Sequence, residues 1–233
     1  MKHAYVSFAA GIAALAFGCA ADPGTQPHDM SAAQHEAMAN QEQQNAQAHE
    51  AQHDPAAATP STQCAGRGGC WTSTSNPTAQ HSKDAAEHHD LAAKHRAAST
   101  ALKDAEARTC VGISDEDRDT SPFYHREDIA SVSPYSVETG SGKSRTMKVV
   151  GSTVVFRALP GMTAEWLQRV VDCHVARSAA AGFDMPEMSF CPLELKDVKA
   201  TVASTGDGFA VNVSSENPAT VAEIQKRAQA LKL

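Results

Sequence analysis

A five-residue stretch in the first quarter of the chain carries the pattern of a zinc peptidase: residues 49–53 are H-E-A-Q-H. On a helix, His49 and His53 would share a face and bind one Zn²⁺, while Glu50 would activate a metal-bound water. The flanks argue against catalysis, because they are polar or small and Asp54-Pro55 ends the helix before a third ligand. We therefore expect a solvated, histidine-bearing segment. Non-catalytic metal binding by His49 and His53 is the alternative, and a zinc peptidase is the least favoured interpretation.

A second set of donor side chains lies near the C-terminus: Cys173, His174, Met185, Met188 and Cys191. Thiol, thioether and imidazole groups of this kind suit copper. Three features favour a structural role instead. His174 falls on the apolar side of a predicted helix, methionine commonly fills gaps in a core, and a disulfide would consume both thiols. A copper site here therefore stays an alternative.

Five cysteines lie beyond the N-terminal segment, and outside the cytoplasm such cysteines are expected to form disulfides. Cys64 and Cys70 flank a loop with three glycines, which closes easily. We predict a second disulfide between Cys173 and Cys191, which leaves Cys110 free. Pairing of Cys110 with Cys173 or with Cys191 is equally compatible with the sequence.

A third group of chemically capable residues follows an acidic turn: residues 121–129 are S-P-F-Y-H-R-E-D-I. The serine suits a helix cap and Pro122 suits the first helical position, which predicts a short helix to residue 129. His125, Arg126 and Asp128 are the first candidates for a binding site. The alternative is that apolar neighbours dock this helix while its charges pair on the surface.

A long helix is predicted from about residue 78 to residue 109, because this stretch has no glycine or proline. Spacings of three and four residues define one stripe along it: His81, Asp84, His88, Leu91, His95, Ala98, Leu102 and Ala105. We expect the leucines to pack on a domain and the histidines to be partly exposed. The alternative is a pH- or metal-sensitive seam in which Asp84 and His88 form half of a metal site.

The sequence pattern of the remainder, residues 145–233, predicts a compact unit of the α+β class. Strand, helix, strand, strand and helix patterns follow one another, in the order β(β)αββα, where the bracketed strand stands for a hairpin turn at Gly151-Ser152. We expect a small antiparallel sheet covered by two helices on one face. Residues 78–144 form a long helix plus an irregular segment, of which residues 85–135 should pack alongside this unit.

The N-terminus predicts a secretion signal over residues 1–18, because an uncharged apolar run follows Lys2 and is too short for a comfortable membrane span. The sequence L-A-F-G-C ending at Cys19 resembles the lipobox of bacterial lipoproteins. That resemblance implies a lipid on Cys19 and, because no aspartate follows, sorting to the outer membrane on the side that faces the periplasm. Ordinary cleavage after Ala20 is the alternative, and it would give a soluble periplasmic or secreted protein.

Residues 19–77 are rich in Ala, Gln, His, Pro, Ser and Thr, which predicts a disordered tether. Within it, a helix over residues 31–53 is the alternative, with Ser31 and Gln34 as its capping box. Residues 85–233, with the S-P-F-Y-H-R-E-D-I block, resemble an uncharacterised family of secreted delta-proteobacterial lipoproteins, which implies no activity.

The net charge of −7 argues against a nucleic-acid partner, which would need a basic patch. No serine-hydrolase, P-loop or dinucleotide motif is present in the sequence. We therefore expect a non-enzymatic binding or envelope-structural lipoprotein without a cofactor. Its partners would be a membrane, through the lipid anchor alone, and an unknown protein or envelope component. The alternative is a periplasmic copper- or zinc-binding protein.

Overall fold

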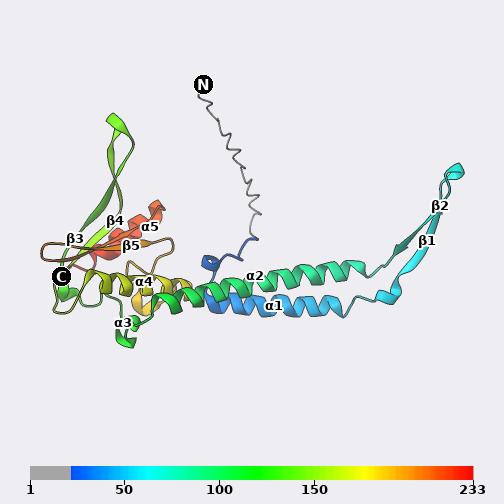
Figure 1. Ribbon diagram of the computed structural model, residues 1–233, viewed down its shortest axis with the longest axis horizontal. Coiled ribbons are helices and arrows are strands. Elements are labelled where there is room, and N and C mark those ends of the chain that lie inside the picture. Colours follow the sequence, from blue (N-terminus) through cyan, green and yellow to red (C-terminus); the bar gives the residue numbers. More distant parts are fainter. Residues whose placement is uncertain (1–21, 233) are drawn as a thin grey trace, which may run out of the picture.

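Two long helices, α1 (Ala32–Glu50) and α2 (Ala79–Thr109), lie side by side in opposite directions and form a rod (Figure 1). The computed structural model describes residues 22–232, so the predicted signal peptide and Cys19 lie outside the described residues. Ser31 caps α1 in the way its sequence predicts: its Oγ accepts from the Gln34 amide while the Gln34 side chain accepts from the Ser31 amide.

Small residues allow the two helices of the rod to approach closely. Ala39, Ala46 and Ala92 are at most 1% exposed, and the buried residues of each helix recur at spacings that include three, four and seven residues. The prediction of a disordered tether over residues 19–77 is therefore wrong for the α1 segment. Composition misled here because an alanine side chain offers little apolar surface by itself, yet it packs closely when a second helix supplies the facing alanines.

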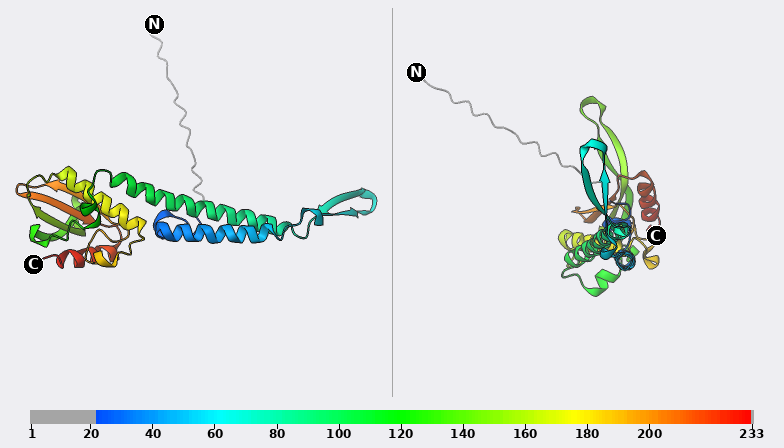
Figure 2. Two further views of the ribbon diagram at one scale, coloured as in Figure 1. Left: turned by 90° about the horizontal axis from the view of Figure 1, so that it is seen from below. Right: turned by 90° about the vertical axis from the view of Figure 1, so that its right-hand side faces the viewer.

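A two-stranded hairpin of β1 (Thr59–Cys64) and β2 (Cys70–Ser75) connects the two helices at the far end of the rod (Figure 2). Every side chain described in its strands is exposed, including Trp71 at 53%. The Cys64–Cys70 disulfide closes the hairpin and confirms that predicted pair. A hairpin that packs on nothing is only marginally stable in water, so this crosslink is its main support.

At the opposite end of the rod lies the C-terminal domain, which confirms the α+β class (Figure 2). Its antiparallel sheet has the order β3 (Ile129–Thr139), β4 (Thr146–Arg157), β6 (Gly208–Ser214), β5 (Lys199–Ser204). Neighbouring strands bring Val132, Val154, Val211 and Val202 into one row. Core residues of α4 (Ala164–Ala180) and α5 (Pro218–Gln229) pack on this same row, so both helices cover one face, as the sequence predicts.

Short elements complete the fold: α3 (Asp115–Asp119) and the 3₁₀ turns η1 (Pro27–Asp29), η2 (Pro55–Ala57), η3 (Gly66–Gly68), η4 (Arg126–Asp128), η5 (Gly142–Ser144) and η6 (Pro186–Met188). The helix predicted from Pro122 is wrong, because only η4 is helical there before strand β3 begins. The predicted hairpin turn at Gly151-Ser152 is also wrong. Strand β4 runs straight through these residues and pairs with β3.

Gly151 lies where two strands come unusually close. A β-carbon at this position would sit 1.8 Å from the carbonyl oxygen of Val213 on β6. We expect Gly151→Ala to lower the free energy of unfolding by about 2 kcal/mol or more, because the two backbones must separate. Urea denaturation monitored by tryptophan fluorescence measures this loss of stability. Gly206→Ala is the matched control, since nothing lies within 4 Å of its added carbon; equal losses in the two variants would contradict the argument.

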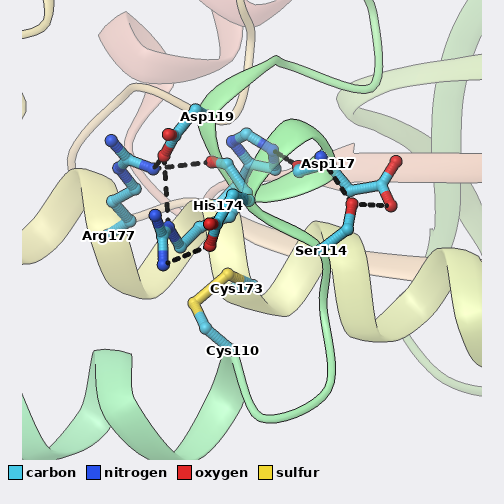
Figure 3. A network of polar contacts seen from close by, with 9 residues as sticks. Cys110, Ser114, Asp117, Asp119, Cys173, His174 and Arg177 are labelled. Atoms are coloured by element: carbon cyan, nitrogen blue, oxygen red, sulfur yellow. Dashed lines mark hydrogen bonds and ion pairs between the residues drawn. A yellow bond between two sulfur atoms is a disulfide. The ribbon is translucent and has the colours of Figure 1, made fainter.

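A disulfide between Cys110 and Cys173 joins the end of α2 to α4 (Figure 3). The predicted Cys173–Cys191 pair is therefore wrong, and one of the pairings that the sequence leaves open is present instead. Cys191 is a free thiol, 2% exposed within the core, and its burial raises its pKa to about 11. The deciding fact is tertiary: α2 packs directly on α4 and brings Cys110 to Cys173.

Candidate metal centre

Ionisable residues alternate with alanine layers along the contact between α1 and α2. We call this set the histidine seam: His35, Glu42 and His49 from α1 and His81, Asp84, His88 and His95 from α2. Three hydrogen-bond contacts cross the seam, His35 with His95, Glu42 with His88, and His49 with His81. An antiparallel pair of helices with a repeat of seven residues produces this facing order.

One end of the seam brings three potential metal ligands together. His49 Nδ1 lies 3.2 Å from His81 Nδ1 and 3.7 Å from a carboxylate oxygen of Asp84. All three ligand atoms lie within 4.8 Å of one another, and the residues are half-buried. Two nitrogens that bind one tetrahedral Zn²⁺ at 2.0–2.1 Å are separated by about 3.3 Å. The spacing of the imidazoles is thus close to that of a zinc site, and it is equally compatible with a hydrogen bond between them.

A carboxylate–imidazole pair flanks these three ligands. His88 Nδ1 lies 2.5 Å from a carboxylate oxygen of Glu42, and the His88 ring stacks on His49 with centroids 5.4 Å apart. A carboxylate that holds a neighbouring imidazole fixes the orientation of its ring. The predicted half-site of Asp84 and His88 is therefore divided, because Asp84 faces His49 whereas His88 faces Glu42.

At the other end of the seam, His35 and His95 form a buried pair. Their Nδ1 atoms are 3.0 Å apart, and the residues are 0% and 5% exposed. His35 Nε2 must donate to the Gln26 carbonyl oxygen at 3.0 Å, so in neutral His35 the Nδ1 accepts and His95 Nδ1 donates. Burial and the nearby His35 both lower the pKa of His95. This pair is stable as two neutral rings and cannot hold a proton on both facing nitrogens.

The H-E-A-Q-H pattern does not form a peptidase site. His53 Nδ1 contacts the carbonyl oxygen of Thr78 at 3.1 Å, and Glu50 lies 2.8 Å from His89 Nε2. His49 alone of the three contributes to the ligand cluster. The two histidines that the motif would pair on one helix therefore have different partners on the facing segment.

The predicted copper ligands separate in the same way. Met185, Met188 and Cys191 pack in the hydrophobic core, while Cys173 is consumed by its disulfide. His174, 4% exposed, donates from Nε2 to the Asp117 carbonyl oxygen at 2.9 Å (Figure 3). Burial lowers the pKa of His174, which favours the neutral ring. These contacts support a structural role for these five residues and not a copper site.

His125 and Asp128 do lie together, with Glu127 between them in sequence. One ligand atom from each falls within 4.8 Å of the others, and His125 Nδ1 is 3.3 Å from Glu127. Arg126 lies over the ring of Phe190, 5.9 Å from its centroid. His125 and Glu127 are exposed, so this cluster resembles an ordinary solvated turn more than a shaped metal site.

Within residues 22–232, no helix combines the length and apolar character needed to cross a membrane. The two disulfides are consistent with an extracytoplasmic location. Comparisons with protein-family models, with curated proteins and with solved structures gave no match to this chain.

Sequence reasoning missed the α1 half of the seam, above all His35 and Glu42. A signal was present: the run from Ala32 to His49 repeats at alternating spacings of three and four residues. That repeat matches the stripe on the later helix in antiparallel order. A comparison of the two stripes would have predicted that these two helices pack against each other.

Proposed function

We propose that this protein is a non-enzymatic, extracytoplasmic protein that binds one divalent transition-metal ion between α1 and α2. The observation that carries the proposal is the convergence of His49, His81 and Asp84 from two helices at ligand spacing. Two imidazoles and a carboxylate suit Zn²⁺, with Cu²⁺ and Ni²⁺ as competitors for the same donors. Water would complete the coordination.

The binding would also hold the rod together. Because the ligands come from both helices, the ion stabilises the paired form and not the separated helices. The protein requires neither Glu50 as a base nor His53 as a ligand for this role. A peptidase built on the H-E-A-Q-H motif would require both residues.

The test is zinc titration of the full chain without a histidine tag, after chelator treatment, by competition with a chromophoric chelator. We expect one site per chain, and at least about a 100-fold loss of affinity in His81→Ala and in Asp84→Asn. His53→Ala is the matched control because it lies in the motif but contacts Thr78. It should keep the affinity of the unmodified protein, as should Glu50→Gln.

The opposite pattern would overturn the proposal. If His53→Ala abolished zinc binding while His81→Ala left it intact, the motif and not the interhelical cluster would hold the ion. Zinc that binds with several weak sites, unaffected by any single variant, would equally reject a defined centre. Hydrogen exchange of α1 supplies a second readout, since bound zinc should slow it.

A second candidate function is that of a lipid-anchored spacer, which the length of the rod supports. The 31 residues of α2 span about 46 Å at 1.5 Å per residue. With a lipid on Cys19, such a rod would present its domain or its distal hairpin away from the outer membrane to an envelope partner. Labelling with a palmitate analogue tests the anchor, since Cys19→Ser should abolish it.

A further inference from the structure

A cavity of about 260 Å³ lies between α3, η4 and the start of α4, remote from the histidine seam. Its floor is apolar: Phe156, Leu167 and Val170 are each at most 2% exposed. Trp166 and Met162, which are half-buried, contribute the apolar part of its wall. The volume lies just below the usual range of about 300–1,000 Å³ for ligand sites, which suits a molecule with one ring or a short branched chain.

The charged groups that line this cavity are unbalanced. Three acidic residues line it, Glu116, Asp117 and Asp128, together with His125, and among the described residues no arginine or lysine does. Among the described side chains, none of the three carboxylates has an ion-pair partner within 4.0 Å, in contrast to nearby Asp119, which pairs with Arg118 and Arg177. An apolar cavity bordered by unpaired negative charge is complementary to a cation with an apolar body.

We infer that this cavity binds a small organic cation, an ammonium group carried on an aromatic or branched apolar body. The apolar body fills the space above Phe156 and Leu167, where burying it removes apolar surface from water. The ammonium group lies toward Asp128 and Glu116, because the Asp117 carboxylate already accepts a hydrogen bond from Ser114, and the ring of Trp166 adds a cation–π contribution. The inference is independent of metal binding, because no residue of the histidine seam lines the cavity.

The two tryptophans of the chain allow a direct test. Trp71 lies on the distal hairpin and Trp166 lines the cavity. In a Trp71→Phe background, the fluorescence of the full chain reports the cavity alone. The probes are phenethylammonium, 2-phenylethanol and phenylacetate, which share one apolar body and carry a positive, zero and negative charge. We expect a saturable change with phenethylammonium at about tenfold lower concentration than with the alcohol, and none with phenylacetate.

Variants locate the charge recognition. Asp128→Asn should remove the preference for the cation while the alcohol still binds, and Glu116→Gln, at an exposed position, should reduce that preference without a folding risk. Asp115→Asn is the control because Asp115 pairs with Arg118 and does not line the cavity.

Three outcomes would overturn the inference: equal binding of cation and alcohol, tighter binding of phenylacetate, or no saturable signal with any probe. A preference for the cation that survives both Asp128→Asn and Glu116→Gln would also place the binding elsewhere. Zinc affinity should be unchanged in all of these variants, so failure here is distinguishable from failure of the metal proposal.

Discussion

Replacing Cys110 and Cys173 with serine is expected to lower the free energy of unfolding of the C-terminal domain by about 4 kcal/mol. The two cysteines are 63 residues apart, and the loop they close contains α3, β3, β4 and half of α4. Removing the crosslink gives the unfolded chain the entropy of a long open loop and also releases α2 from α4. Urea denaturation followed by Trp166 fluorescence in the Trp71→Phe background measures the loss.

The second disulfide provides the control. Cys64 and Cys70 are six residues apart, in a hairpin whose strand side chains are exposed. Their replacement by serine should shift the same unfolding transition by less than about 0.5 kcal/mol, since surface changes away from the core have small effects. Similar losses in the two double variants would show that the rod and the domain unfold as one unit. That result would contradict the local role assigned to each crosslink.

Lowering the pH from 7.5 to 5.5 is expected to loosen α1 from α2. The pKa of His95 is lowered below its ordinary value of 6.5 in the folded protein, chiefly by burial and secondly by His35. Below pH 6.5 the separated helix therefore binds a proton more readily than the paired one. The contribution of this pair to stability is present above that pH and is lost as the pH falls below it.

Hydrogen exchange measured by mass spectrometry in the presence of a chelator tests this, after correction for the intrinsic effect of pH on exchange. Loss of a buried hydrogen bond costs about 1–3 kcal/mol, so protection of α1 should fall on the order of tenfold. The variant His35→Leu/His95→Leu should keep its protection across the same range. The idea would be falsified if the double variant and the unmodified protein lost protection equally.

His174 titrates in the same direction, because burial lowers its pKa as well. Its Nε2 contact with Asp117 is in the domain and not in the rod (Figure 3). Acid should therefore weaken the packing of α3 on α4 independently of α1. Exchange resolved by segment separates the two effects, since the leucine variant changes only the first.

Local physical chemistry was enough for several features. The Ser31 cap, the long helix without glycine or proline, the alternating strands Lys199–Ser204 and Gly208–Ser214, and the Cys64–Cys70 pair all follow from neighbours in the chain. Each depends on spacing over a few residues, which the sequence carries directly. The α+β class follows from their order.

Other features depended on which elements meet. The stripe of α1 is built from alanine and ionisable residues, and it gains a buried face only when α2 supplies the matching stripe. The choice of Cys110 as the partner of Cys173 required the packing of α2 on α4. His49 likewise acquires its metal-ligand geometry from His81 and Asp84, which are 32 and 35 positions later in the chain, and not from His53. A local pattern specifies which side chains share one helix face, but the facing helix decides what that surface can bind.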